Sequence, residues 1–372
     1  MRIGVPAEIT TGETRVAVTP ETLIKLKALG HQVLVQAGAG LAASVPDSAY
    51  QAGGAEMTDA AGAYQADIVL KVRGPLESEM AQIQAGSVLV GMLNPFDAQG
   101  LQRLAGANLT SFALEAAPRT SRAQRMDVLS SQANVAGYKA VMLAVDKYRR
   151  FFPMLMTAAG TVKAARVVVL GVGVAGLQAI ATAKRLGAVI EASDVRPSVQ
   201  EQVESLGAKF IAVPYETDEE REAAQGVGGY AKPMPASWLE RQKVEVAKRV
   251  AQADVVITTA LIPGRPAPVL VTEEMVQAMK PGSVIVDLAA PQGGNCPLTV
   301  PGQTVVKHGV TLIGHTNIPA LMAADASALY ARKVLDFLKL IISPEGALNI
   351  DPSDDIVAAC LMTQGGRLTR PN

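Results

Sequence analysis

Short aliphatic runs alternate with stretches of helical spacing along the first third of the chain. RIGVP and HQVLVQ have the length and composition of strands, and TPETLIKLKALG between them has the spacing of a helix. This alternation is typical of βαβ units, in which a helix joins two parallel strands. Residues 130–148 also have helical spacing, interrupted by Gly137, and this segment is long enough to bridge two domains. We therefore expect the first domain boundary there.

A second α/β series follows this helix. Its expected strands are RVVVLG, AVIEASD, AKFIAV, DVVITTA, SVIVDLA and TVVKHG. After them comes an amphipathic stretch, ADASALYARKVLDFLKLII, which we expect to pack on the first domain. The sequence therefore predicts the α/β fold class, with two Rossmann-like domains that contain parallel sheets. The first domain is discontinuous, residues 1–129 and 312–372, and the second comprises residues 130–311.

Length and composition narrow the class of protein. A chain of 372 residues exceeds the usual size of a single core. Its 34 basic and 34 acidic residues leave no net charge to attract nucleic acid or an acidic membrane surface. Cys296 and Cys360 form no CxxC pair, so the sequence predicts neither a disulfide framework nor a zinc site. We expect a reducing, cytoplasmic compartment, no metal and no nucleic-acid partner.

No stretch has the features of a signal peptide or a membrane span. MRIGVPAEITTGETR lacks an apolar segment behind a basic start and is interpreted as containing a first strand. The apolar stretch 167–183 is interrupted by glycines and by Gln178, and it runs into Lys184 and Arg185. Because it is too short and too interrupted to cross a bilayer, we expect no direct membrane insertion, while a membrane partner stays open.

A glycine motif opens the second series. Gly171, Gly173 and Gly176 form GxGxxG directly after the strand RVVVL and before the helical AGLQAIATAKRLG. The first glycine permits a tight turn, the second lets the backbone approach a pyrophosphate, and the third allows close contact between helix and strand. Asp194 ends the next strand, where a carboxylate accepts hydrogen bonds from ribose hydroxyls and favours NAD over NADP; Arg196 nearby can soften that preference. The second domain is therefore predicted to bind NAD(H).

A similar glycine pair, in QAGAGLAAS, is interpreted as a structural turn. It follows the strand HQVLVQ, but no periodic helix comes promptly after it and no acid ends a strand at the right distance. The motif after RVVVL is thus the one complete fingerprint in the sequence. One dinucleotide site is predicted.

The sequence offers few candidates for a catalytic base. An enzyme that oxidises an alcohol or an amine with NAD must remove a proton as well as a hydride. His31 and His308 lie in turn-like contexts, where a surface or capping role is the usual explanation. His315 lies near the domain junction and is also interpreted as structural, although a place beside a cleft stays open.

Three stretches resemble a known superfamily. MRIGVPAEITTGETRVAVTPE, LKVRGP and VDLAAPQGGNCP are similar to alanine dehydrogenase and to the NAD-binding α subunit (domain I) of proton-translocating NAD(P) transhydrogenase. Alanine dehydrogenases use a Lys, a His and an Asp, and the matching positions here are Arg73, Asn94 and Pro291. Direct hydride transfer between two nicotinamides requires no base. The resemblance therefore favours the transhydrogenase; an alanine-dehydrogenase-type NAD-dependent amino-acid oxidoreductase and a non-catalytic NAD sensor remain alternatives.

The transhydrogenase resemblance continues through SRAQRMDVLSSQANVAGYKAV and implies a group of residues at the nicotinamide: Arg119, Gln124, Asp127, Ser130 and Tyr138. Asp127, Arg119 and Ser130 have the donors and acceptors that a carboxamide needs. The resemblance assigns Gln124 to the NADP(H) nicotinamide ribose on a partner domain. The alternative is a polar loop in which Ser121 or Asp127 caps the following helix.

For the adenosine half of the nucleotide, the resemblance implies Val174, Asp194, Val195, Arg196, Gly229, Gln242 and Leu261. Tyr230, in GGYAK, matches a mobile loop of the family that closes over nucleotide. The surrounding stretch 216–235, acidic and then glycine-rich, is interpreted as a lid, with a flexible insertion as the alternative.

One fingerprint leaves the second nucleotide to another polypeptide. The resemblance implies membrane-embedded and NADP-binding transhydrogenase subunits as partners, with NADP(H) on the partner and proton translocation in the membrane part. The chain ends at Asn372 without membrane helices, so we expect the split arrangement of subunits. The resemblance also implies a homodimer, held peripherally on the cytoplasmic face of the inner membrane through its partners.

Overall fold

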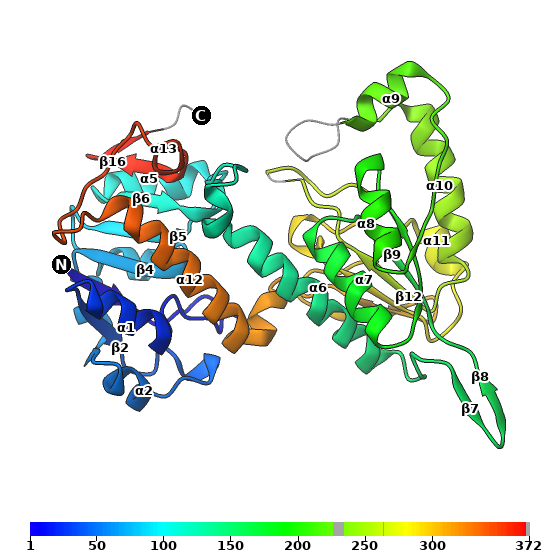
Figure 1. The fold of residues 1–372 in the computed structure, drawn as a ribbon, viewed down its shortest axis with the longest axis horizontal. Coiled ribbons are helices and arrows are strands. Elements are labelled where there is room, and N and C mark those ends of the chain that lie inside the picture. The colour runs from blue at the N-terminus through cyan, green and yellow to red at the C-terminus, as the bar shows by residue number, and fades with distance from the viewer. Residues whose placement is uncertain (226–233, 263, 370–372) are drawn as a thin grey trace. The chain divides into compact units, whose positions relative to one another are not determined.

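The computed structural model describes residues 1–225, 234–262 and 264–369, and it divides the chain into two compact units. Unit 1 is Met1–Gln132 together with Pro319–Asn372, and unit 2 is Ala133–Ile318 (Figure 1). Unit 1 is discontinuous because the C-terminal segment packs into its core. The division falls a few residues C-terminal to the boundaries expected from the sequence.

Unit 1 is built on an eight-stranded sheet in the order β17-β16-β6-β5-β4-β1-β2-β3. Pairing is parallel from β3 to β6, whereas β16 is antiparallel to both of its neighbours. The strands are β1 (Arg2–Val5), β2 (Gln32–Gln36), β3 (Glu56–Thr58), β4 (Ile68–Arg73), β5 (Val88–Met92), β6 (Thr110–Ala113), β16 (Leu361–Gln364) and β17 (Arg367–Leu368). The parallel part has the 3-2-1-4-5-6 order of a doubly wound fold.

Helices cover this sheet and close its core. They are α1 (Pro20–Ala28), η1 (Leu41–Ala43), α2 (Asp47–Ala52), α3 (Ala60–Tyr64), α4 (Glu77–Met80), α5 (Ala98–Gly106), η2 (Leu114–Ala116), η3 (Ala123–Met126), α12 (Ala323–Ile341) and α13 (Asp355–Cys360). Phe337 of α12 meets Phe112 of β6 edge to face, with ring centroids 5.2 Å apart. The returning helix therefore completes the core, as the amphipathic pattern predicted.

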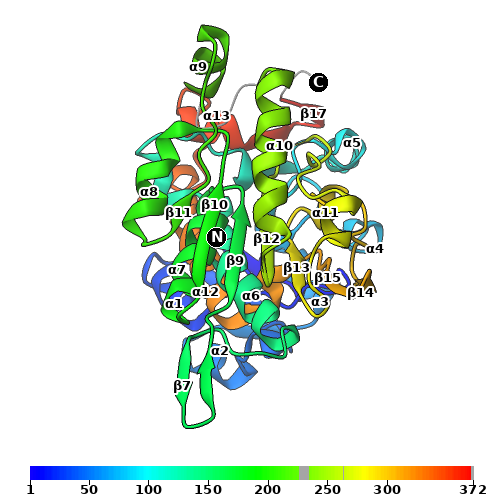
Figure 2. The ribbon, with the colours of Figure 1, turned by 90° about the vertical axis from the view of Figure 1, so that its right-hand side faces the viewer.

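Unit 2 contains a seven-stranded sheet in the order β11-β10-β9-β12-β13-β15-β14, which Figure 2 shows side by side. Its strands are β9 (Arg166–Leu170), β10 (Val189–Ser193), β11 (Lys209–Phe210), β12 (Val255–Thr258), β13 (Val284–Asp287), β14 (Thr304–Lys307) and β15 (Val310–Ile313). All pairs are parallel except β14 with β15. The predicted class of two Rossmann-like α/β domains is confirmed, with antiparallel additions at one edge of each sheet.

The central strands of unit 2 bury side chains on both faces. The helical segments are α6 (Val128–Lys147), which begins in unit 1, α7 (Val174–Arg185), η4 (Pro197–Val199), α8 (Gln200–Ser205), α9 (Asp218–Gln225), α10 (Ala236–Val250), α11 (Glu273–Gln277), η5 (Ala290–Gln292) and η6 (Ile318–Met322). Val167 and Val169 pack with α6, α7 and α8, whereas Val168 and Leu170 pack with α10 and α11. Burial on both faces explains why β9 is a continuous aliphatic run.

A two-stranded hairpin was not predicted. It consists of β7 (Leu155–Thr157) and β8 (Gly160–Val162), paired antiparallel, and it projects from unit 2 in Figure 1. Its strands are three residues long and mostly exposed, so they lack the alternating pattern that marks a strand in a sequence.

Candidate functional site

The turn between β9 and α7 requires glycine at two of its three motif positions. Gly171 has a φ of +92°, and a Cβ there would lie 2.8 Å from Thr259 Oγ1. A Cβ on Gly176 would lie 2.1 Å from the carbonyl oxygen of Gly171. At Gly173 a Cβ would meet no atom of the described residues within 4 Å. The outer glycines thus serve packing, while the middle one borders open space that a ligand can approach.

The helix that follows points its N-terminus at this open space. Gly173 is the N-cap of α7 and Val174, which is about one-third exposed, is its first residue. The first turn of a helix has N–H groups without intrahelical partners and a partial positive charge, which together favour a phosphate. Gly137 of α6 permits close packing here, because a Cβ on it would lie 2.2 Å from the carbonyl oxygen of Ala175.

Asp194 lies directly after β10, where the sequence predicted an acid. Its Oδ1 accepts hydrogen bonds from the backbone N–H and Nε of Arg196, both at 2.9 Å. Its Oδ2 accepts from the backbone N–H of Val172 at 2.7 Å and from Nη2 of Arg196 at 2.9 Å. Burial opposes the charged form, but these hydrogen bonds hold the pKa of Asp194 below its ordinary value. The carboxylate is ionised, and its acceptor positions are already in use.

Three further predicted contacts lie in unit 2. Nε2 of Gln242, on α10, donates to Oγ of Ser193 at 3.2 Å, which places Gln242 beside the end of β10. The carbonyl oxygen of Val195 accepts from the hydroxyl of Tyr215 at 3.3 Å. Leu261 follows β12 and is partly exposed. Val195 and Gln242 are therefore adjacent to Asp194 in the chain or through Ser193.

Gly229 and Tyr230 lie outside the described residues. The structure describes the segments on either side of them, where Tyr215 stacks on Trp238 with ring centroids 5.7 Å apart. Glu220 of α9 accepts from Arg241 of α10 at 2.8 Å. The described parts of the excursion are therefore joined by an aromatic stack and an ion pair.

Asp287 organises the loops beside the nucleotide turn, and sequence reasoning missed it. This fully buried carboxylate ends β13 and accepts hydrogen bonds from five donors: Thr258 Oγ1, Ala289 N, Asn295 N, Cys296 N and Thr299 Oγ1. Asn295 in turn bonds both the N–H and the C=O of Ala260, in the loop that leads to Leu261. An acid at the end of the fully apolar run SVIV was the signal that could have identified it.

The residues predicted for the nicotinamide lie in unit 1, except Tyr138. Gln124 is on η3, where Ala123 and Met126 are buried and Gln124 itself is exposed. Asp127 follows η3, and its carboxylate accepts from the backbone N–H of Ser130 at 2.9 Å and from the hydroxyl of Ser130. This is the geometry of a helix cap, so Asp127 has the capping role that the alternative interpretation gave it.

The remaining two residues of this group are exposed. Arg119 lies in a bend after η2. Tyr138 lies on α6 within unit 2 and has 39% of its surface exposed. Ser130 and Tyr138 thus belong to one helix but to different units.

A cluster of buried charges occupies the carboxyl ends of β1 and β4 in unit 1. Arg15 is bound by both carboxylate oxygens of Glu13 and donates to Gln132 Oε1 at 2.7 Å. Arg73 Nε lies 3.1 Å from Glu13 Oε2. Lys71 forms ion pairs at 3.2 and 2.6 Å with two further carboxylates, those of Glu8 and Glu79. Arg73 is therefore part of an ion-pair network, with no proton to accept.

The other positions that match catalytic residues of alanine dehydrogenase have no titratable side chain. Asn94 has a φ of +56°, and its N–H donates to Glu115 Oε1 at 2.6 Å. Burial raises the pKa of Glu115 to about 7, against the lowering effect of its hydrogen bonds. Pro291 lies in η5 of unit 2. Glu115 is thus the one carboxyl group near these positions with a pKa in the neutral range among the described residues.

The histidines take two different structural roles. His31 is buried, with 4% of its surface exposed, and burial lowers its pKa. The expectation of a surface or capping role for His31 was therefore wrong, because the packing of unit 1 covers the side chain. His308 has a φ of +50°, and its Nε2 lies 2.8 Å from Glu273 Oε1. In the part of the chain that the structure describes, no group of three or more His, Cys, Asp or Glu side chains could hold a metal ion.

Fold and turn define a two-unit α/β protein with a dinucleotide-type glycine turn in its second unit. Models of two protein domains match the chain: "Alanine dehydrogenase/PNT, N-terminal domain" over residues 4–136 and "Alanine dehydrogenase/PNT, C-terminal domain" over residues 140–371. The chain belongs to the alanine dehydrogenase/PNT family.

Within that family, the similarity is greater to transhydrogenase subunits than to alanine dehydrogenases. The chain is 50% identical to an NAD(P) transhydrogenase subunit alpha of Rhodospirillum rubrum, covering 100% of this chain and 98% of the relative. A crystal structure of transhydrogenase from Sinorhizobium meliloti superposes with a TM-score of 0.90 at 47% identity, covering 99% of this chain and 100% of that one. Alanine dehydrogenase of Bacillus subtilis is 31% identical, over 99% of this chain and 93% of its own. The resemblance predicted from the sequence is confirmed.

Across the described residues, no helix combines the length and the apolar character that a membrane crossing requires.

Proposed function

We propose that this chain binds NAD(H) in unit 2 and transfers hydride between NADH and NADP⁺ bound on a partner subunit, as a component of a proton-translocating transhydrogenase. The observation that carries the proposal is a complete nucleotide turn combined with Arg73, Asn94 and Pro291 at the positions of a dehydrogenase's proton-handling residues. When both nucleotides are bound, the two nicotinamides exchange a hydride and no proton has to be removed. The protein then needs to supply alignment and to exclude water.

The residues of unit 2 fit the phosphate and ribose of NAD(H). Open space at Gly173 and the N-terminus of α7 suit a pyrophosphate, and Asp194 suits ribose hydroxyls. Val174, Val195, Arg196, Gln242 and Leu261 complete the proposed adenosine site. We also assign Gly229 and Tyr230 to it on the resemblance alone.

The nicotinamide role of the unit 1 residues is compatible with the cap at α6. A carboxylate has about four acceptor positions, and Ser130 occupies two of those on Asp127. Asp127 therefore keeps acceptor capacity for a carboxamide NH₂ while it caps the helix. Arg119 and Ser130 supply donors, Tyr138 lies further along α6, and the exposed Gln124 is oriented for a partner domain rather than for the core of unit 1.

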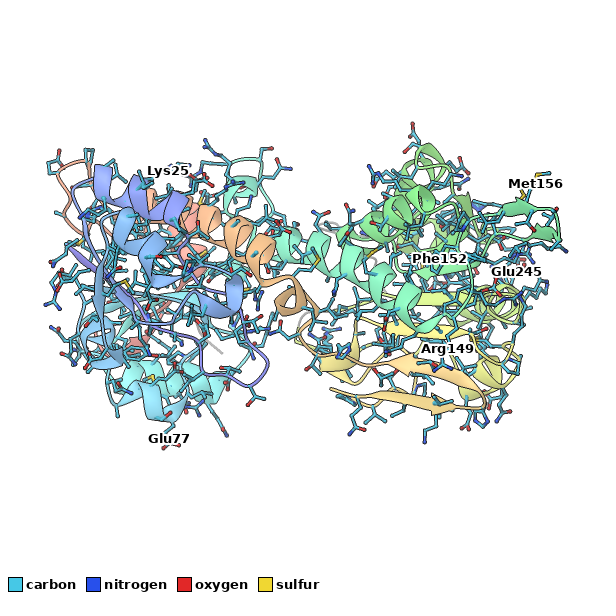
Figure 3. The ribbon with its side chains drawn as sticks, turned by 90° about the horizontal axis from the view of Figure 1, so that it is seen from below. Lys25, Glu77, Arg149, Phe152, Met156 and Glu245 are labelled. Atoms are coloured by element: carbon cyan, nitrogen blue, oxygen red, sulfur yellow. The ribbon has the colours of Figure 1, made fainter. Side chains whose placement is uncertain are left out.

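The proposal includes partners and a location. NADP(H) is bound by a separate subunit and protons are translocated by a membrane-embedded one, which place this chain peripherally on the cytoplasmic face of the inner membrane. We further propose a homodimer. Support comes from the exposed apolar side chains of the β7–β8 region, Phe151, Met154 and Met156, each more than half exposed; Met156 lies at the outer margin of unit 2 in Figure 3. A lone hairpin is marginally stable in water, so these side chains gain most from a second copy.

The test is a stopped-flow mixing experiment. The purified chain with NADH is mixed with the NADP⁺-loaded soluble domain of a transhydrogenase β subunit, and NADH oxidation is followed. We expect rapid oxidation that requires the partner domain, and a large loss of rate in Gln124→Asn with NADH binding retained. NADH binding without any hydride transfer would contradict the proposal and favour a sensor.

The alternative, an alanine-dehydrogenase-type oxidoreductase, has one specific observation in its favour: the raised pKa of Glu115, which suits a general base. It predicts reduction of NAD⁺ by alanine without any partner protein. The same preparation tested with alanine and NAD⁺ decides between the two, and we expect no reduction.

A further inference from the structure

The loop of residues 117–127 in unit 1 is tied to the C-terminal segment by an arginine. Arg122 Nη1 and Nη2 each donate to one carboxylate oxygen of Asp354, both at 2.7 Å. Arg122 also pairs with Asp355. A bidentate arginine–carboxylate pair fixes orientation as well as distance, unlike most ion pairs at a protein surface.

The partner of this arginine is itself firmly held. Asp354 is the N-cap of α13, and its Oδ1 accepts from the backbone N–H groups of Ile356 and Val357 at 2.9 and 3.1 Å. Both of those residues are fully buried in the main core of unit 1. The Asp354 side chain is only 20% exposed. Arg122 therefore binds to a fixed point of the fold.

Gln124 lies between this tie and two others. Lys333 Nζ of α12 lies 3.4 Å from the carbonyl oxygen of Gln124, and Arg125 Nε lies 3.7 Å from Asp336 Oδ2. Inside the loop, Ala123 and Met126 are buried. The backbone beneath Gln124 is thus held on both sides, while its side chain is exposed.

We propose that Arg122 is a positioning residue for hydride transfer: through its pair with Asp354 it fixes the backbone from which Gln124 reaches the partner's nucleotide. This inference rests on the function proposed above for Gln124. A side chain that acts across an interface loses less entropy when its backbone is ordered beforehand, and small errors in alignment are costly in rate. Arg122 itself contacts no nucleotide in this account.

Three variants test the pair: Arg122→Gln, Asp354→Asn and the double variant. Asparagine caps helices as well as aspartate does, so Asp354→Asn removes the charge pair and keeps the cap of α13. Arg103→Gln is the matched control, because Arg103 is an exposed cation on α5 of the same unit, 3.9 Å from Asp97. Each protein is measured for NADH affinity, for melting temperature and for the single-turnover rate of NADH oxidation with the NADP⁺-loaded partner domain.

We expect each single variant to slow hydride transfer on the order of tenfold while NADH affinity stays within about twofold of wild type. The double variant should be no slower than either single one, because both remove the same pair. Arg122→Lys should recover part of the rate, and Arg103→Gln should match wild type.

Other outcomes overturn the inference. A wild-type rate in the single variants, even with a lower melting temperature, would show that the pair serves stability alone. A loss of NADH affinity equal to the loss of rate would place Arg122 in nucleotide binding. If the wild-type chain itself transfers no hydride, the proposed function fails, and that result is distinct from a failure confined to the variants.

Discussion

The nucleotide turn of unit 2 and the Gln124 loop of unit 1 are built in different ways. The turn consists of backbone that is packed against backbone, and its outer glycines leave no room for a Cβ. The loop is a short 3-10 segment held by polar side chains to α12 and α13, which come from the other end of the chain. We infer that the turn depends on the absence of side chains, whereas the loop depends on particular side chains. The two should therefore fail differently when they are mutated.

The largest effect is expected for alanine in the glycine turn. Gly176→Ala places a Cβ 2.1 Å from a carbonyl oxygen, so we expect a loss of about 3 kcal/mol in the free energy of unfolding and no NADH binding. Gly173→Ala meets open space and should leave stability unchanged, while NADH affinity falls on the order of 100-fold because the methyl group occupies the ligand's approach. Urea unfolding and NADH fluorescence titration measure both. Equal destabilisation by the two variants would refute the division of roles.

The two units should also differ in their response to pH. The folded pKa of Glu115 is raised to about 7, above its unfolded value, so its stabilisation is present at acid pH and is lost as pH rises from about 4.5 to 7. Asp194 has a lowered folded pKa, so its stabilisation is lost as pH falls instead. We expect Glu115→Gln to remove about 2 kcal/mol of the decline in unfolding free energy between pH 5 and pH 8. Chemical unfolding at several pH values is the measurement, and an unaltered pH profile would contradict it.

Asp127 allows the structural and nucleotide roles within the loop to be separated. Asp127→Ala removes the cap of α6 and should cost about 1 kcal/mol of stability, whereas Asp127→Asn keeps the cap. If Asp127 also holds the carboxamide, the asparagine variant should be as stable as wild type and yet slower in hydride transfer. Wild-type rates in Asp127→Asn would leave the cap as its full role.

The smallest effect is expected at Arg196, and its sign is informative. Arg196 and the Val172 N–H fill the acceptor positions of Asp194, so ribose hydroxyls must displace the guanidinium. Arg196→Ala should therefore tighten NADH binding by about threefold and weaken NADPH binding, since the cation that screens the carboxylate is gone. Titration with both nucleotides checks this. Weaker NADH binding would instead show that Arg196 contacts the nucleotide.

Local requirements made some features of this molecule predictable from sequence. Gly171 and Gly176 are fixed by backbone conformation and contact within one βαβ unit, so their spacing alone indicated the turn. The α/β class followed from periodicity in the same way, as did the amphipathic C-terminal helix.

Features that depend on distant partners were not predictable. Asp287 gathers donors from loops on two sides of β13, and the Arg122–Asp354 pair joins the two chain segments that make up unit 1. The burial of His31 depends on the chain packed around it, and Arg196 could be placed beside Asp194 but not shown to fill its acceptor positions. Pattern reasoning sees one segment at a time, and these contacts are set by tertiary packing.

Direct transfer between nucleotides is the central claim, and an isotope label tests it most directly. NADH deuterated at C4 on the transferred face is mixed with this chain and the NADP⁺-loaded partner domain in ordinary water, and the NADPH formed is analysed by mass spectrometry. The account predicts that deuterium is carried from NADH to NADPH without exchange with solvent. NADPH that contains hydrogen from water, or no NADPH at all, would contradict it.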